Sequence, residues 1–228
     1  MLPVAAPPRV RDLLRAAPDG PVPVLHRGPV ATYVEVSGRC VGLLSRDAVA
    51  VPCGLRSDLP RLDHLAPTAA VRGGELHVGG QALRIGRLVD VSVPRIDSRA
   101  QTPAPLPRSL RVGRGGGLTP YDDDVLAGWI VTHRAAGVPT VDVDGLVRAL
   151  FRRTTLLSAT LLDCAMHGEA LPQLVDWLAA AGTPAQDAAT QALLAVGHSS
   201  GRGLLHGATT ALAHLAPARS PHRNGTAA

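Results

Sequence analysis

The sequence changes character at G-R-G-G-G-L-T-P-Y-D-D-D-V-L-A-G, residues 113–128. Short strand-like segments lie before it, and longer segments with helical periodicity follow it. Its four clustered glycines let the backbone turn with positive φ and let a ligand approach the main chain; they are Gly113, Gly115, Gly116 and Gly117. Thr119 is suited to cap a helix, and Pro120 is suited to its first position. The stretch therefore predicts a glycine-rich loop that leads into a helix N-terminus.

Three carboxylates, Asp122, Asp123 and Asp124, fall in the first turn of that predicted helix. Free backbone N–H groups at a helix start attract anions. Acidic side chains there favour the helix dipole, but they repel a second anion nearby. Three roles stay open for Asp123 and Asp124: complementing the dipole, holding a divalent metal, or accepting N–H bonds from an amide or amino group of a substrate. The spacing alone does not separate these roles.

The region before the glycine-rich loop is typical of a β-rich domain. Its short apolar segments alternate or cluster as strands do, at residues 22–25, 31–36, 40–44, 48–51, 75–78, 82–85 and 88–93. Glycine pairs at 73–74 and 79–80 predict hairpins on both sides of the fifth segment. We therefore expect a small barrel or sandwich-like domain over residues 9–100. The first eight residues, rich in Pro and Ala, are predicted to be disordered.

The region after it is typical of a helical domain. Pro103, Pro105 and Pro107 predict a linker over residues 101–112. Helical periodicity then covers residues 122–136, 143–152, 155–167, 171–181, 185–196 and 204–215. The predicted fold class is α+β, with a β-rich N-terminal domain followed by an all-helical C-terminal domain of residues 113–215. The tail, residues 216–228, is predicted to be disordered.

The composition excludes several classes of protein. All 23 basic residues are Arg, so the chain has no lysine for a Walker A phosphate loop or a Schiff base. Aromatic residues make up only 2%, which leaves little material for stacking nucleic-acid bases. Cys40, Cys53 and Cys164 form no CxxC pair, which argues against a disulfide framework or a zinc knuckle and fits a reducing cytoplasm. No apolar run approaches the roughly 20 residues that cross a membrane. We expect a cytoplasmic protein that binds no nucleic acid, membrane, cofactor or metal.

A second glycine-rich loop, G-H-S-S-G-R-G-L-L-H-G, covers residues 197–207 and again leads into a predicted helix. Ser199 or Ser200 can cap that helix, and the two helix starts could converge on one anion. His198 is a candidate general acid or base, with a solvated loop histidine as the alternative.

A third candidate lies at the start of the segment T-T-L-L-S-A-T-L-L, residues 154–162. Thr155 and Ser158 are three residues apart, so on a helix they share a face and could both point to a ligand. The alternative is that Thr155 caps the helix and that both hydroxyls bond to its backbone.

Three ordered motifs resemble the family of uncharacterised domains that includes the AllH subunit of oxamate carbamoyltransferase. They are G-G-G-L-T-P-Y-D-D-D-V-L-A-G (115–128), R-T-T-L-L-S-A-T-L-L-D-C-A-M-H-G (153–168) and G-H-S-S-G-R-G-L-L-H-G (197–207). The segment V-P-C-G-L (51–55) also looks like the N-terminal part of that family. The resemblance implies a subunit that works with AllG-like and FdrA-like partners to transfer a carbamoyl group between oxamate and phosphate in ureide catabolism. Its substrate would be a small anion such as carbamoyl phosphate or oxamate.

The positions that match the family motifs supply the candidate site. We predict that His198 carries a proton and that Asp123 and Asp124 accept N–H bonds from the carbamoyl group. The residues expected to bind the substrate anion are Gly115, Gly117, Thr119, Thr155, Ser158, Ser199, Ser200 and Gly201. Two alternatives stay open for the function, a non-catalytic subunit that binds a metabolite or assembles the complex, and a metal-dependent hydrolase that uses the aspartates.

The chain departs from the family pattern at two places. Tyr121 and Asp122 stand where the family motif has Ser-Gly, and Gly203 stands where an acidic residue is expected. Tyr121 and Asp122 should crowd the loop and add charge, and Gly203 removes one acceptor for an amide. These departures bear on the substrate, and oxamate itself is the part of the resemblance that they support least.

Overall fold

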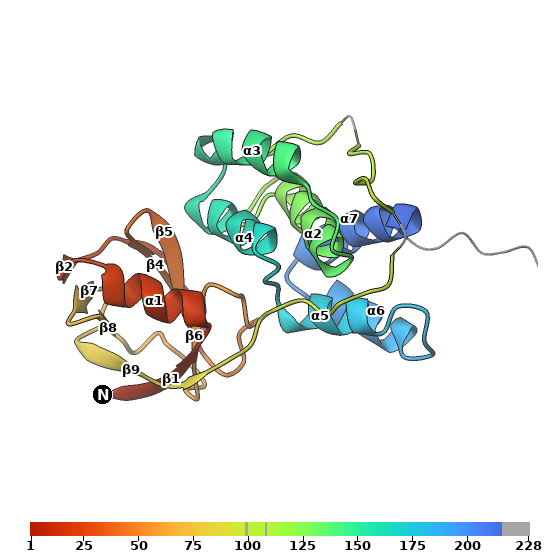
Figure 1. Cartoon of the computed structure of the whole chain (residues 1–228). Helices are drawn as coiled ribbons and strands as arrows, with labels where there is room; N and C mark the ends of the chain where they lie inside the picture. Colours follow the sequence, from red (N-terminus) through yellow and green to blue (C-terminus); the bar gives the residue numbers. More distant parts are fainter. Residues whose placement is uncertain (99, 108, 216–228) are drawn as a thin grey trace, which may run out of the picture.

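The structure is a computed structural model in which residues 1–98, 100–107 and 109–215 are described (Figure 1). A nine-stranded sheet curls into a half-barrel, and a domain of seven helices follows it in the described part of the chain. This confirms the predicted α+β class with a β-rich part before a helical one. The tail predicted to be disordered, residues 216–228, lies outside the described residues.

The half-barrel is built from strands whose order in the sheet differs from their order in the chain. The strands are β1 (Leu2–Ala6), β2 (Gly20–Pro21), β3 (Val24–Arg27), β4 (Ala31–Val36), β5 (Arg39–Leu44), β6 (Gly54–Ser57), β7 (Ala69–Arg72), β8 (Glu75–Val78) and β9 (Gln81–Leu88). Their order is β2-β7-β8-β9-β1-β6-β5-β4-β3. β1 runs parallel to β9 and β5 runs parallel to β6, and the other pairs are antiparallel. Helix α1 (Pro8–Ala16) adds Val10 and Leu14 to the core enclosed by the sheet.

The prediction of disorder for residues 1–8 is wrong. Leu2–Ala6 forms β1, which lies in the middle of the sheet between β9 and β6. Val4 and Ala6 are 4% and 0% exposed, so this short Pro- and Ala-rich segment is held by burial and by two neighbouring strands. Both partners are more than 45 residues away in the sequence, and no local pattern reveals such pairing.

Residues 48–51, predicted as a strand, form a loop, and of the predicted strand 88–93 only Leu88 lies in a strand, at the end of β9. Three segments not predicted as strands, β2, β6 and β7, also belong to the sheet. The apolar side chains of Val49 and Val51 gave the loop its strand-like pattern. They are apolar because they pack toward the helical domain, where Val49 contacts its core and Val51 contacts residues of α4 (Leu156–Met166).

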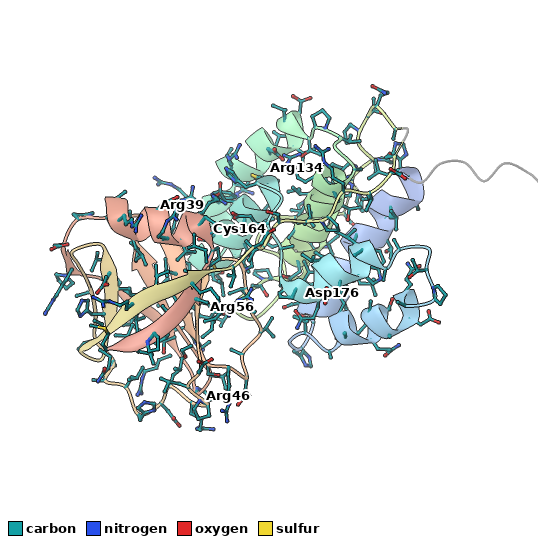
Figure 2. The ribbon with its side chains drawn as sticks, turned by 60° about the horizontal axis from the view of Figure 1, so that its bottom comes forward. Arg39, Arg46, Arg56, Arg134, Cys164 and Asp176 are labelled. Carbon is teal, nitrogen blue, oxygen red and sulfur yellow. The ribbon has the colours of Figure 1, made fainter. Side chains whose placement is uncertain are left out.

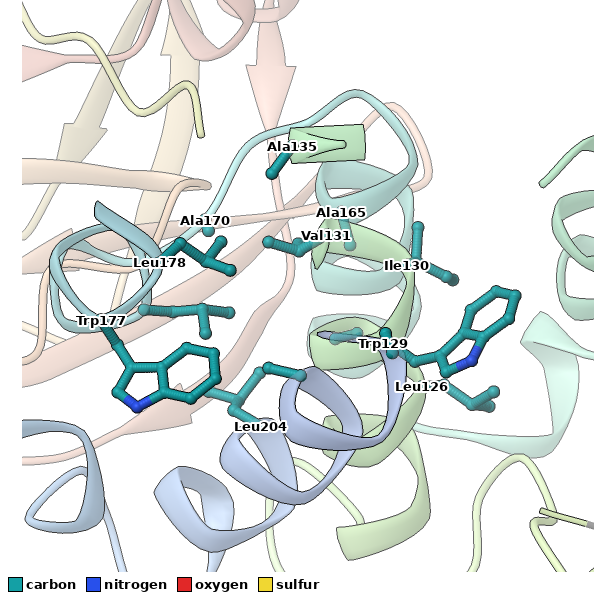
Figure 3. Close-up of a cluster of buried hydrophobic side chains, with 14 of the residues drawn as sticks. Leu126, Trp129, Ile130, Val131, Ala135, Ala165, Ala170, Trp177, Leu178 and Leu204 are labelled. Atoms are coloured by element: carbon teal, nitrogen blue, oxygen red, sulfur yellow. The ribbon is translucent and has the colours of Figure 1, made fainter. Parts of the chain in front are cut away.

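The helical domain of the described residues consists of α2 (Tyr121–Ala135), α3 (Val141–Ala149), the 3-10 helix η1 (Phe151–Arg153), α4, α5 (Pro172–Ala179), α6 (Gln186–Leu194) and α7 (Ser200–Leu215). Its core gathers side chains of α2, α4, α5 and α7, and Figure 3 shows Trp129, Trp177 and Leu204 among them. α2 begins one residue later than its capping pattern predicts, since Pro120 is the residue before it and Thr119 makes no cap.

Helices α2 and α7 cross in close backbone contact. A Cβ added to Gly128 would lie 2.1 Å from the carbonyl oxygen of Leu204, and one added to Gly207 would lie 1.9 Å from that of Val125. Only glycine fits at such a crossing, because any side chain would push the helices apart. The crossing brings the loop before α2 beside the loop before α7.

The segment predicted as a linker, residues 101–112, packs against the helices in its described part. Ala104 is 3% exposed, and its N–H donates to Nε2 of the buried His133 at 2.9 Å. Leu106, Leu110 and Val112 also contact the helical core. The segment therefore contributes to the helical domain, and the exact domain boundaries stay a prediction.

The half-barrel and the helices meet at a third cluster of buried side chains. Tyr33, Cys40 and Cys53 come from the half-barrel, and Leu157 and Cys164 come from α4. Figure 2 shows Cys164 and Arg39 at this junction. All three cysteines are free and buried, and burial raises the pKa of each thiol. The protonated thiols thus act as small apolar groups in the interface.

Candidate functional site

A pocket of about 560 Å³ lies where the two parts of the molecule meet. The half-barrel side contributes Tyr33 and the loop of Val49, Val51 and Pro52. The helical side contributes residues of α2, α4, α5 and both glycine-rich loops. Pockets of this size commonly hold small molecules, so this is the candidate site.

The polar part of the pocket centres on Asp124. This side chain is 6% exposed, and the hydroxyl of Thr119 donates to its Oδ2 at 3.2 Å. Thr119 Oγ1 also lies 2.9 Å from Ser200 Oγ, which joins the start of α2 to the start of α7. Together these three residues form the acid–hydroxyl cluster of the pocket.

The surroundings of Asp124 change its acidity. Burial raises its pKa to about 7, while hydrogen bonds from Ser200 and Thr119 oppose the rise and the nearby Asp123 adds to it. A carboxyl with such a pKa exists in both protonation states near neutral pH. It can therefore donate or accept a hydrogen bond from a ligand, or exchange a proton with it.

The two glycine-rich loops lie together at this pocket. Gly116 and Gly117 line it from the first loop, and Gly197, His198 and Ser199 line it from the second. Within the described ranges, the N–H groups of Gly116, Gly117, His198 and Ser199 donate to no protein acceptor. Unpaired N–H groups at two loops that lead into helices are suited to bind the oxygen atoms of a ligand.

His198 belongs to the second glycine-rich loop at the pocket. It lines the pocket and is exposed, and Arg202 of α7 donates to its carbonyl oxygen at 3.3 Å. The imidazole thus adds a second group that can carry a proton, beside the carboxyl of Asp124.

Asp123 does not line the pocket, although it was predicted to act beside Asp124. It is 1% exposed and accepts the N–H of Gly113 at 2.7 Å and the hydroxyl of Ser158 at 2.6 Å. The hydroxyl of Thr154 donates to it as well. These bonds use the carboxylate to join the first loop, α2 and α4, so its geometry is that of a structural anchor.

Other predicted site residues also lie outside the pocket and shape its loops. Thr155 caps α4 by accepting the N–H of Ser158 at 3.0 Å and donates to the carbonyl of Leu118 at 2.6 Å. Gly115 permits a close approach, because a Cβ there would lie 2.5 Å from the nitrogen of Tyr121. Gly201 donates its N–H to Val196 at 3.0 Å, which leaves it none for a ligand.

The departures from the family pattern have local explanations. Asp122 accepts the N–H of Arg111 at 2.8 Å and pairs with Nε of Arg114 at 2.8 Å. The hydroxyl of Tyr121 lies 3.2 Å from Nδ1 of His206 on α7. Neither side chain lines the pocket, so the expected crowding does not occur there. At Gly203, a Cβ would lie 2.7 Å from Cβ of Asp124, which leaves no room for an acidic residue.

A second carboxylate lines the pocket that no sequence motif pointed to. Glu169, between α4 and α5, is 9% exposed and lines the pocket. Its Oε2 accepts Nη1 of Arg9 at 2.6 Å, across 160 residues of sequence. Tyr33 and Pro52 were also missed, although the segment 51–55 had been noted for its resemblance. Contacts between distant segments bring these residues to the site.

A metal site is not formed by the aspartates. Among the described residues there is no group of three or more His, Cys, Asp or Glu that could hold a metal ion. The three aspartates point to different partners, as the preceding contacts show.

In the described part of the chain, no helix is long and apolar enough to cross a membrane.

No curated protein and no solved structure matches the chain. A match to a family model covers residues 111–212, and that family is described as the oxamate carbamoyltransferase subunit AllH. The matched segment holds the first loop, Asp124, the second loop and most of α7. Residues 111–212, which supply the helical side of the pocket, are therefore similar to the AllH family.

Proposed function

We propose that the chain is an AllH-like subunit of a multi-subunit carbamoyltransferase, acting on oxamate or a related ureide or amide, and that its pocket holds the carbamoyl-bearing substrate. The observation that carries the proposal is the acid–hydroxyl cluster of Asp124, Thr119 and Ser200 between two loops with unpaired N–H groups. It lies within the segment that matches the family.

The chemistry needs positioning more than a covalent nucleophile. In the direction toward phosphate, a phosphate oxygen attacks the carbamoyl carbon, the bond from that carbon to the donor nitrogen breaks, and the nitrogen takes a proton. The N–H groups of Gly116, Gly117 and Ser199 stabilise the charge that develops on the carbonyl oxygen. Asp124 accepts an N–H bond from the carbamoyl group, and His198 delivers the proton.

The partners follow from the family description, which names a subunit of a larger enzyme. We infer AllG-like and FdrA-like chains as those partners, and a cytoplasmic complex. Exposed apolar side chains on α3 offer one surface for them, with Val141 73% and Leu146 69% exposed. The three free, buried thiols fit a reducing compartment.

The test is turnover by the complex reconstituted with both partner subunits. Asp124→Asn and His198→Ala should each lower kcat by about 100-fold or more, the usual contribution of a positioned acid or base. Asp176→Asn and His214→Ala are matched controls, because both residues are exposed and lie outside the pocket. If both site variants turn over as the controls do, the catalytic assignment is wrong.

A non-catalytic role is the second candidate, and the largely apolar wall of the pocket favours it. In that case the purified chain would bind a ligand at the pocket while a partner subunit performs the chemistry. Asp124→Asn would then weaken ligand binding and raise KM, with kcat unchanged, since uniform binding acts on KM alone.

A further inference from the structure

The pocket has an apolar wall with few polar groups. Val131 of α2, Leu157 and Leu161 of α4 and Leu174 of α5 form much of it, and Val51 closes it from the half-barrel. Such a wall favours binding only when an apolar part of a ligand covers it. The binding free energy then becomes more favourable by about 25 cal/mol for each Å² of apolar surface removed from water. A small, fully polar ion leaves that surface unused.

The ionisable groups that line the pocket are two carboxyls and the imidazole of His198. Among the described lining residues there is no arginine, and the chain has no lysine. The two carboxyl groups that line it are Asp124 and Glu169. An anion in this pocket would meet unpaired N–H groups at the loops and the imidazole of His198, but no arginine or lysine, and it would be repelled by ionised Asp124.

A cationic ligand is also poorly matched. Glu169 is already paired with Arg9 at 2.6 Å, so its charge is compensated within the protein. The hydroxyl of Thr119 donates a hydrogen bond to Asp124, and Ser200 lies beside it. These hydroxyls stabilise the carboxylate, so it does not need a cation as its partner. The geometry therefore favours a neutral group that both donates N–H bonds to Asp124 and accepts N–H bonds from the loops.

We infer that the pocket selects a neutral carbamoyl compound with an apolar body, such as a monosubstituted urea or a primary amide with an alkyl or aryl group, in preference to the small anion oxamate. This inference rests on the proposed function, because it names the substrate class of the same site. The carbamoyl group meets Asp124 and the N–H groups of the loops, and the apolar body covers the wall of Val131, Leu157 and Leu174.

The inference can be tested by calorimetry on the full chain with three probes: butylurea, pentanoate and oxamate. Butylurea combines the carbamoyl group with an apolar body, pentanoate keeps the body but is an anion, and oxamate keeps the carbamoyl group but has no body. Butylurea should bind at least about tenfold more tightly than either, a difference of about 1.4 kcal/mol.

A charge placed at the pocket should change this preference. Leu118 lines the pocket and is 42% exposed, so Leu118→Arg adds a cation without disturbing the core. We expect it to shift the affinity ratio toward pentanoate by about tenfold. Leu88→Arg is the matched control, because Leu88 is 45% exposed on β9 and lies outside the pocket. It should leave the ratio as in the wild type.

Two results would overturn the inference. One is oxamate binding as tightly as butylurea, and the other is no binding of butylurea at millimolar concentration. Either result leaves the proposed function standing if Asp124→Asn still abolishes turnover of oxamate by the complex. Conversely, tight butylurea binding with full turnover by Asp124→Asn would remove the catalytic assignment and keep the ligand class.

Discussion

Three adjacent carboxylates of the same type occupy three different environments at the start of α2. Asp122 pairs with Arg114, Asp123 is held by Ser158 and Thr154, and Asp124 lines the pocket. Successive residues of a helix point about 100° apart, so neighbours in sequence cannot share one site. The triplet is thus one ion-paired carboxylate, one structural anchor and one carboxyl that lines the pocket.

The raised pKa of Asp124 makes a prediction about stability. The native state keeps a proton on this carboxyl up to about pH 7, whereas the ordinary value is 3.8. The stabilisation that the protonated carboxyl of Asp124 adds to the folded state is therefore fully present below about pH 4. It is lost as the pH rises to 7 and above. Asn has no such proton, so from pH 5 to pH 8 the unfolding free energy of Asp124→Asn should gain up to about 3 kcal/mol relative to the wild type.

Urea denaturation at the two pH values measures this change. Comparing the variant with the wild type at each pH removes the contributions that the two proteins share. Asp176→Asn, on the exposed surface of α5, should follow the wild type at both pH values. An unchanged difference between Asp124→Asn and the wild type would contradict the buried, proton-holding carboxyl.

The motifs in the sequence pointed to the two loops that line the pocket, but they did not show which residues of those motifs face it. Thr119, Ser200 and His198 do line the pocket, because glycine with hydroxyl residues at a helix start marks a backbone that a ligand can approach. Asp123 and Ser158 bind each other instead, 35 residues apart in the sequence. Which hydroxyls face the pocket depends on such distant partners. A single sequence does not show which of its residues pair with one another.

At the scale of elements, the helices were easier to predict than the strands. Helix α4 begins with a threonine cap, and apolar residues recur along it at helical spacing. Both signals lie within the helix itself. Strand β1 carries no such signal, because its hydrogen bonds go to β9 and β6. The crossing of α2 and α7 is also non-local, because Gly128 and Gly207 each fit against the backbone of the other helix.

That crossing should be sensitive to one methyl group. In Gly207→Ala, the new Cβ would lie 1.9 Å from the carbonyl oxygen of Val125 and 2.8 Å from the nitrogen of Trp129. Both atoms belong to the backbone of α2, so the helices must move apart, at a cost of about 1–3 kcal/mol in unfolding free energy. Thermal or urea denaturation measures the loss.

Gly145→Ala in α3 is the matched control, because nothing lies within 4 Å of its Cβ position. Alanine is the better helix former, so this variant should gain about 0.5–1 kcal/mol. A Gly207→Ala protein as stable as the Gly145→Ala protein would show that α2 and α7 do not depend on close backbone contact.

At the scale of the whole molecule, the pocket exists only where the half-barrel meets the helices. An ion-pair cluster fixes that junction: Asp163 of α4 accepts Nη2 of Arg9 at 2.7 Å and is also bonded by Arg39 of β5. Arg9 reaches Glu169 with its other nitrogen, so one arginine of α1 holds both acids. Burial alone would raise the pKa of Asp163, but the hydrogen bonds from Arg39 and Arg9 outweigh it and lower the pKa.

Removing the charge of Asp163 should loosen this junction. Asp163 is 9% exposed at its side chain, and Asp163→Asn leaves Arg9 and Arg39 without their shared charge, at a cost of about 1–3 kcal/mol in unfolding free energy at pH 7. Because the pKa of Asp163 is lowered in the folded state, its ion pairs stabilise the protein above the ordinary Asp pKa. That stabilisation is lost as the pH falls through the pKa of the folded state. Urea denaturation should therefore show the variant approaching the wild type as the pH falls below 3.8, the ordinary Asp value. Asp63→Asn, which removes an exposed pair with Arg61, should change nothing measurable, and an equally small effect at Asp163 would mean that packing alone holds the two parts together.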